Sequence, residues 1–280
     1  MIVRVAFGSD NHLDVNQVSV EETLHQQAKW LNEHHVQAYI HGGDLFNDFS
    51  QTRKYMYQLE HQLTGHAYYI LGNHDMLNHA DYATVEHLTD PQYLHHRWID
   101  IPQTDWRIIG NNGWYDYSFS TYANDPERVA KWKKVYWLDS SIDQPMSDLE
   151  RMRLVDDQIS KDLEQAALDR KRVILVTHFA PRHELLNKKP SFVDTPRKNY
   201  FYQMINAMMG SDQLGELLES YQNVQMVMYG HLHRQHPALT RHGVTYYHQA
   251  VGIKNKRINE WQAPTFIEQW QRTLRIFDLK

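Results

Sequence analysis

The sequence predicts an α/β fold in which parallel strands are flanked by helices. Short apolar runs of strand length alternate with longer amphipathic segments, as in parallel strands joined by crossover helices. Five of these runs lead directly into a glycine or a polar residue that can bind metal or move a proton. Because open α/β sheets carry their chemistry at the carboxyl ends of the strands, we expect these polar residues to gather at one edge.

The composition is that of an ordinary globular protein, with 280 residues, 41% hydrophobic and 22% charged. The formal net charge of -5 disfavours a surface built for nonspecific nucleic-acid binding, since such surfaces are usually basic. The N-terminal run, residues 1–7, lacks the basic residues of a signal peptide, and no run reaches the length of a membrane span. We therefore expect a cytoplasmic protein.

The first part of the chain alternates predicted strands and helices. Ser19 is the expected N-cap of the first helix, and Glu22, three residues later, is its expected capping-box partner. Strands are predicted at residues 2–7, 36–40 and 67–71, and helices at residues 20–34, 50–63 and 81–88. A further strand is predicted at residues 106–109.

The pattern changes after residue 113, where aromatic residues are dense up to residue 143 and a long polar helix is predicted at residues 147–167. We predict one domain over residues 1–280, in which residues 113–167 form an embedded cap insertion that overhangs the site. The alternative is that the aromatic rings only pack a core or an interface.

The last part of the chain restores the strand and helix alternation. Strands are predicted at residues 172–176, 224–229 and 244–250, an edge strand at 273–279, and a helix at 212–221. Residues 179–202 contain three prolines and several basic residues, which favours a mobile basic loop near the site, with a solvated surface as the alternative.

Residues that could bind metal or transfer a proton follow five of the predicted strands. They are Asp10-Asn11-His12, Gly42-Gly43-Asp44, Gly72-Asn73-His74-Asp75, Thr177-His178 and Gly230-His231-Leu232-His233. The chain contains no cysteine, so a metal site would use His, Asp, Glu and Asn. The two glycines before Asp44 would let the backbone turn tightly beside a metal.

These five blocks, in this order, resemble the calcineurin-like metallophosphoesterase superfamily of two-metal phosphate-ester hydrolases. The resemblance spans residues 10–233 and implies a β-sandwich flanked by helices, with four layers in the order α/β/β/α. It also implies a bridging hydroxide as nucleophile. By motif, Asp10, His12, Asp44 and His233 would hold the first metal, and Asp44, Asn73, His178 and His231 the second.

Two divalent metals are therefore the expected cofactors. Nitrogen and oxygen ligands without sulfur suit several transition metals better than calcium. Manganese or iron is the first expectation, taken largely from the resemblance, and zinc, nickel, cobalt or magnesium are alternatives.

His74 has a different expected role from its neighbours. The resemblance directs Asn73 to the metal, so the His74 imidazole can donate a proton to the leaving alkoxide as a general acid. Asp75 would then hold the ring in its tautomer and raise its pKa. For Asn11, His41, His79 and Arg234, closeness in sequence to a ligand is the only argument for a role.

The sequence thus predicts a metal-dependent hydrolase of phosphomonoesters or phosphodiesters, with a small phosphorylated substrate. One alternative is a non-catalytic protein-interaction module on the same fold, which the complete set of ligands disfavours. Another is a nuclease acting on DNA, which the acidic net charge disfavours. The oligomeric state is not predicted.

Overall fold

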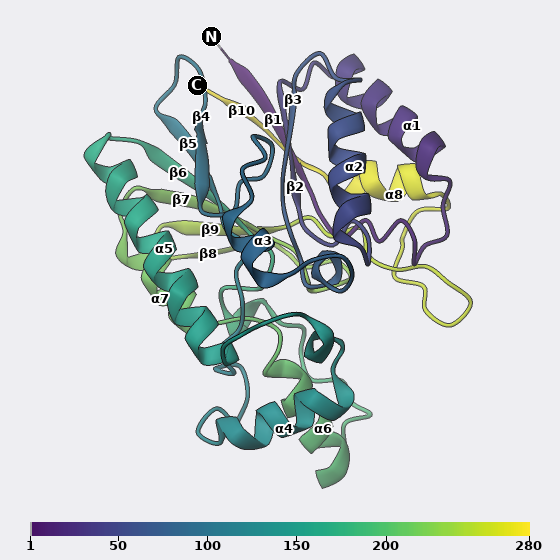
Figure 1. Ribbon diagram of the computed structural model, residues 1–280, viewed down its shortest axis with the longest axis vertical. Helices are drawn as coiled ribbons and strands as arrows, with labels where there is room; N and C mark the ends of the chain where they lie inside the picture. The colour runs from purple at the N-terminus through teal and green to yellow at the C-terminus, as the bar shows by residue number, and fades with distance from the viewer. Residues whose placement is uncertain (1) are drawn as a thin grey trace.

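The computed structural model describes residues 2–280 and contains two β-sheets packed face to face between helices (Figure 1). Met1, which belongs to the predicted N-terminal strand run, lies outside the described residues. Helices cover the outer face of each sheet, so the layers follow the order α/β/β/α. The predicted fold class is therefore confirmed.

The smaller sheet contains the N-terminal strands. Strands β1 (Val3–Gly8), β2 (Ala38–Gly42) and β3 (His66–Ile70) run parallel, and β10 (Arg275–Leu279) pairs antiparallel with β1 at the edge. The strand order is β10-β1-β2-β3. The predicted edge position of the last strand is confirmed.

The larger sheet has the strand order β4-β5-β6-β7-β9-β8. Its four central strands run parallel, whereas the two edge strands pair antiparallel with their neighbours. The bounds are β4 (Arg97–Asp100), β5 (Trp106–Gly110), β6 (Arg172–Thr177), β7 (Val224–Tyr229), β8 (Leu239–Arg241) and β9 (Val244–His248).

Alternation along each strand divides the core between the layers. In β6, Ile174 and Val176 pack between the two sheets, while Val173 and Leu175 face the helices. Because both faces of the central strands are covered, their sequences are continuous apolar runs. The outer face of the smaller sheet is covered by α1 (Val20–Glu33), α2 (Phe49–Glu60) and α8 (Phe266–Thr273), and the outer face of the larger sheet by α5 (Asp148–Leu168) and α7 (Asp212–Ser220).

The predicted start of the first helix is confirmed in part. The Ser19 side chain accepts a hydrogen bond from the Glu22 backbone N–H, as an N-cap should. The Glu22 carboxylate, however, accepts from Gln26 one turn later, so the reciprocal capping-box bond is not formed. Gln26, four residues later on the same face of the helix, donates to the Glu22 carboxylate in place of the Ser19 backbone N–H.

The region predicted as a cap divides into two parts. Its long helix, α5, packs against β6 and α7 and so belongs to the outer layer of the larger sheet. The lobe that projects below the sheets in Figure 1 is formed by α4 (Pro126–Tyr136) together with α6 (Pro196–Asn206). The predicted range 113–167 therefore includes α5, which belongs to the main layers, and leaves out α6, which belongs to the lobe.

The prediction of a loop over residues 179–202 is wrong at its end, because α6 begins at Pro196. Thr195 caps this helix and proline occupies its first position, which is a favourable helix start. Four short helices complete the chain: η1 (His74–Met76), α3 (Tyr82–His87), η2 (Leu138–Ser141) and η3 (His183–Leu185). Between residues 2 and 280, no helix is long and apolar enough to cross a membrane.

Candidate metal centre

The predicted ligands lie at the carboxyl ends of five parallel strands, where the two sheets meet. A parallel bridge between Ser9 and Ala250 joins the end of β1 to the end of β9 across the sheets. The Asp10 N–H donates to Gly43 O over 2.9 Å, which ties the loop after β1 to the loop after β2. Residues from both sheets are thereby held against one another.

Two groups of potential ligand atoms share one residue, Asp44. The atoms of each group lie within 4.8 Å of one another. His12 Nε2 and His178 Nε2 lie 3.7 and 3.2 Å from Asp44 Oδ2. The groups are Asp10, His12, Asp44 and His233, and Asp44, His178 and His231. Asp44 thus occupies the position that a bridging carboxylate needs.

The turns that present these residues adopt unusual backbone conformations. Asp10, Asp44 and His231 have φ values of 55°, 59° and 63°, in the left-handed region that side chains rarely occupy. Gly43, at φ 92°, and Gly72 make the close approach feasible, because a Cβ on Gly72 would lie 2.1 Å from Asp44 Oδ1. Such strain concentrates at functional sites and persists where surrounding contacts enforce it.

Hydrogen bonds on the outer side of the imidazoles fix which nitrogen faces inward. His178 Nδ1 lies 2.9 Å from Gly42 O, so Nδ1 carries a proton, and a bound cation would take the place of any proton on Nε2. His233 Nδ1 lies 3.0 Å from Glu260 Oε2 and is oriented in the same way. These contacts are of the kind that orient metal-bound histidines.

Several buried polar atoms in this cluster have no hydrogen-bond partner among residues 2–280. They include Asn73 Oδ1, Asp44 Oδ2 and His178 Nε2, of which the last two lie 3.2 Å apart without the geometry of a hydrogen bond. In addition, His12 Nε2 and His233 Nε2 lie 3.0 Å apart, which brings two ring nitrogens into direct contact. Buried polar groups are rarely left unpaired, so this donor set fits a pair of cations. The dinuclear divalent centre that the sequence resemblance implies is therefore compatible with the residues present.

The charges inside the cluster support the same conclusion. Burial raises the pKa of Asp10, and the nearby His178 only partly offsets this effect. Burial would also raise the pKa of Asp44, but His178 and the other imidazoles outweigh it and hold this pKa well below its usual range. Burial opposes a charged His178, yet Asp44 and Asp10 raise its pKa to about 10. The two carboxylates thus attract positive charge into the cluster.

Asp75 does not contact the His74 ring, so its expected role as the orienting carboxylate is wrong. Its side chain accepts hydrogen bonds from the backbone N–H groups of Asp44, Leu45 and Gly72, at 2.6, 3.0 and 2.9 Å. Successive residues in the short helix η1 point in different directions, and this carboxylate points beneath the turn after β2. Asp75 therefore positions Asp44.

His74 is half-buried and is oriented by Asn47. Its Nδ1 lies 2.6 Å from Asn47 Oδ1, and its backbone N–H donates to Asp44 Oδ1 over 2.9 Å. The His74 ring also lies edge-on to the His12 ring, with centroids 4.7 Å apart. His74 is thus adjacent to the candidate ligands but belongs to neither of the two groups of potential ligand atoms.

Sequence analysis missed Asn47, Glu260 and Asp139. Asp139 Oδ1 accepts from Asn73 Nδ2 over 2.8 Å, which holds the amide in place and leaves its buried carbonyl oxygen without a partner among residues 2–280. Glu260 and Asp139 belong to no strand-end block, and they lie 27 and 66 residues from their partners in sequence. Of the three, only Asn47 had a signal, its place three residues after Asp44.

Comparisons with known proteins show the family of the chain and similar folds. A family model described as calcineurin-like phosphoesterase matches residues 3–235. No curated protein sequence matches the chain significantly. The fold is similar to that of a dimetal phosphatase from Danio rerio, with a TM-score of 0.54, 12% identity, and 88% of this chain and 86% of that chain covered. It is also similar to TT1561 of Thermus thermophilus, with a TM-score of 0.54, 13% identity and all of both chains covered.

Proposed function

The chain belongs to the calcineurin-like phosphoesterase family, and on that premise we propose that it hydrolyses small phosphate esters with His74 as the general acid. Metal-dependent hydrolysis of phosphoric ester bonds is the activity of this family. We assign three further features to this chain: the residues that would hold the metals, the residue that would donate the proton, and a substrate of small size.

One observation carries the assignment of the ligands. Ligand atoms of Asp44 and His178 lie within 4.8 Å of one another where the two sheets meet. Among residues 2–280, Asp44 Oδ2, His178 Nε2 and Asn73 Oδ1 are buried without a hydrogen-bond partner. Asp10, His12, Asp44 and His233 would hold one metal, and Asp44, Asn73, His178 and His231 the other. When bound, two divalent ions would lower the pKa of the attacking water and stabilise charge on the phosphoryl oxygens.

The chain's own residues would do the remaining work. Asp75 fixes the turn that carries Asp44, and Glu260 orients His233. His74 Nδ1 is engaged by Asn47, so a protonated ring keeps its Nε2–H for the leaving oxygen. A positioned acid of this kind contributes roughly 10²–10⁴-fold when the leaving group needs a proton.

His74→Asn tests the role of the acid. An alkoxide leaving group requires a proton, whereas nitrophenolate departs almost unaided. We therefore expect a loss of roughly 10²–10⁴-fold in kcat on an alkyl phosphate ester and a much smaller loss on a nitrophenyl ester. The alkaline limb of the pH profile should flatten in the variant.

The matched control is His79→Asn, which changes an exposed histidine five residues away that pairs with Asp48. Both esters should be hydrolysed normally by this control. Equal losses on the two esters in His74→Asn, with metal content unchanged, would assign His74 to charge stabilisation on the phosphoryl group instead. The preference for manganese or iron and the cytoplasmic location stay predictions.

A further inference from the structure

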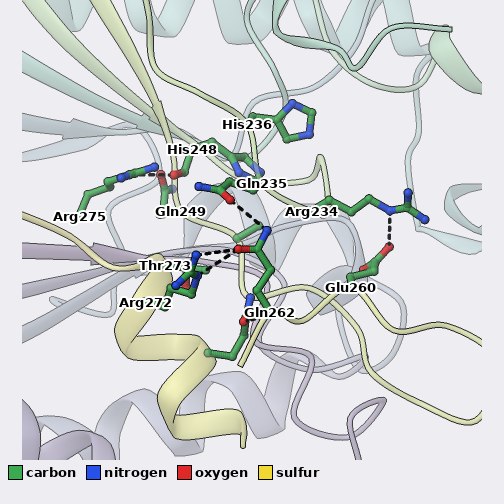
Figure 2. Close-up of a pocket in the computed structure, with 12 residues that line it drawn as sticks. Arg234, Gln235, His236, His248, Gln249, Glu260, Gln262, Arg272, Thr273 and Arg275 are labelled. Atoms are coloured by element: carbon green, nitrogen blue, oxygen red, sulfur yellow. Dashed lines mark hydrogen bonds and ion pairs between the residues drawn. The ribbon is translucent and has the colours of Figure 1, made fainter. Parts of the chain in front are cut away.

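A polar cavity lies beside the candidate metal centre but is lined by none of its predicted ligands (Figure 2). Its volume is about 50 Å³, several times the roughly 10–15 Å³ that seats one water molecule. Figure 2 shows Arg275 beside His248 on one side, Arg234 facing Glu260 on the other, and Arg272 with Gln262 between them. The three arginines come from the loop after β7, from α8 and from the start of β10.

Two of these guanidinium groups have only neutral partners. Arg272 donates from Nε and Nη2 to Gln262 Oε1, over 3.1 and 2.8 Å, and Arg275 Nε donates to His248 O over 3.0 Å. Within residues 2–280, neither arginine has a carboxylate oxygen within the 4.0 Å of an ion pair. A planar guanidinium without a carboxylate partner is suited to binding an oxyanion through two parallel hydrogen bonds.

The buried part of the cavity supplies further unsatisfied polar atoms. Gln249 is fully buried, and neither its amide oxygen nor its amide nitrogen has a partner in the described chain. His248 is 3% exposed, and its Nε2 is also unpartnered among residues 2–280. Leaving such groups buried and unpaired is unfavourable, so a bound polar species is expected here.

The single carboxylate among the lining residues is already engaged. Glu260 Oε2 accepts from the Ile253 N–H over 2.9 Å and lies 3.0 Å from His233 Nδ1, while Oε1 is 3.8 Å from Arg234 Nε. Burial lowers the pKa of His236 and holds that of His248 well below its usual range, so both rings are neutral. Three guanidinium groups and one carboxylate leave the lining with a net positive charge.

From the cavity, its unpaired guanidinium groups and its buried amide, we infer a second oxyanion site for one phosphoryl group, held by Arg272, Arg275 and Gln249. The occupant is either free phosphate or a second phosphoryl group of the substrate. Glu260 touches both this cavity and the candidate ligand His233, so it connects the two sites. The site for free phosphate is independent of the proposed function, whereas its use by a substrate depends on that function.

Equilibrium dialysis of the manganese-loaded protein against radiolabelled inorganic phosphate tests the site. We expect the wild type to bind one more equivalent of phosphate than the double variant Arg272→Gln/Arg275→Gln. The loss of each charge-assisted hydrogen bond should lower the affinity for this second equivalent of phosphate roughly tenfold. The matched control is Arg257→Gln, an exposed arginine of the neighbouring loop that does not line the cavity and should leave the second equivalent intact.

Gln249→Met provides a second, independent test. If the amide contacts the anion, the variant should bind the second phosphate more weakly while its Tm without phosphate is unchanged or higher, because an unpaired buried amide has been removed. Phosphate binding at the wild-type level in both the Gln249 variant and the double variant would overturn the site and leave a water-filled cavity.

Kinetics distinguish the source of the phosphoryl group. If the substrate supplies it, the double variant should raise KM for an ester with a second phosphoryl group far more than KM for nitrophenyl phosphate. If free phosphate supplies it, the two KM values should change equally while the second equivalent is lost. Wild-type protein without any hydrolysis would contradict the proposed function, but the dialysis difference would still report on the oxyanion site.

Discussion

Single side chains outside the strand-end turns orient candidate ligands through hydrogen bonds. Asp139 is the clearest case, because one oxygen accepts from Asn73 Nδ2 and the other accepts from Tyr115 OH and Trp137 Nε1, both at 3.0 Å. It is 2% exposed and comes from the aromatic insertion. The insertion therefore contacts a predicted ligand of the candidate centre through Asp139.

Asp139→Ala should weaken the metal that Asn73 would hold by roughly 10–100-fold, the usual effect of removing a residue that orients a ligand. Competition with a fluorescent chelator measures this affinity. Asp139→Asn keeps an acceptor oxygen and should restore part of it. Tyr115→Phe, which removes only a donor to the other oxygen, serves as the control. An unchanged affinity in Asp139→Ala would show that Asn73 is oriented by other contacts.

At the scale of elements, a buried ion pair joins the lobe to the main layers. Lys133 of α4 donates to Asp148 Oδ1 at the start of α5 over 2.6 Å, and Trp114 Nε1 donates to the same oxygen over 2.7 Å. Lys133 also lies over the Trp114 and Tyr115 rings. Burial would raise the pKa of Asp148, but Lys133 outweighs it and lowers this pKa.

Lys133→Met should destabilise the protein by roughly 3–5 kcal/mol, because it leaves a buried carboxylate without its counter-ion. Urea unfolding measures this change in free energy. Lys134→Met is the matched control, since the neighbouring lysine is exposed and should change stability by no more than about 0.5 kcal/mol. Equal effects of the two substitutions would mean that the ion pair does not hold α4 against α5.

A second feature of α5 gives stability a defined pH dependence. Burial, together with Asp116 and Asp157, raises the pKa of Asp156 from 3.8 to about 7. Between these two values the folded protein retains a proton that the unfolded chain has released, so this residue's contribution to stability falls as pH rises. Below about pH 4 both states are protonated and the effect is absent.

Asp156→Asn should therefore raise Tm more at about pH 8 than at about pH 5, because it removes a carboxylate that is costly to ionise. Differential scanning calorimetry at the two pH values measures this difference. Glu164→Gln, at an exposed position of the same helix, should show no such pH dependence. A Tm gain in Asp156→Asn that is independent of pH would contradict the assignment.

At the scale of the whole molecule, the candidate metal centre lies where the two sheets join. Asp10 and Asp44 come from the smaller sheet, whereas His178 and His231 come from the larger one. Bound metals would therefore link the two sheets, and their binding energy would add to the stability of the sandwich. Without cations, inward-facing groups of this cluster lie against one another, as His12 Nε2 and His233 Nε2 do at 3.0 Å.

Chelation should lower Tm, and manganese should restore it, since a ligand at about 100 times its Kd stabilises the folded state by about 2.7 kcal/mol. Asp44→Asn should largely lose this response, because Asp44 is common to both groups of ligand atoms. His12→Ala should keep part of it. Differential scanning fluorimetry with elemental analysis measures both quantities. A full response to manganese in Asp44→Asn would contradict the bridging role.

The sequence alone determined the α/β class, the positions of most strands along the chain and the residue types at their ends. Strand length, apolar runs and turn residues are local properties, so β1, β2 and β7 begin and end within about two residues of their predicted limits. Strand-end motifs are also local, and the structure brings six of the seven predicted ligands into two groups that share Asp44, while the carbonyl oxygen of the seventh, Asn73, is buried without a partner among residues 2–280.

Only the tertiary structure decided which side chains meet across long stretches of chain. The short strands β4 and β8 lack a clear periodic signal and take shape through their neighbours. Helix α8 was not predicted either, although its Thr265–Glu268 capping box and its amphipathic face are local signals. The assignment of α5 to the outer layer depends on sheet packing, as do the contacts of Asp139, Asp75 and Arg275. Such contacts are fixed by how layers pack, and hydrophobic periodicity along one segment carries no information about them.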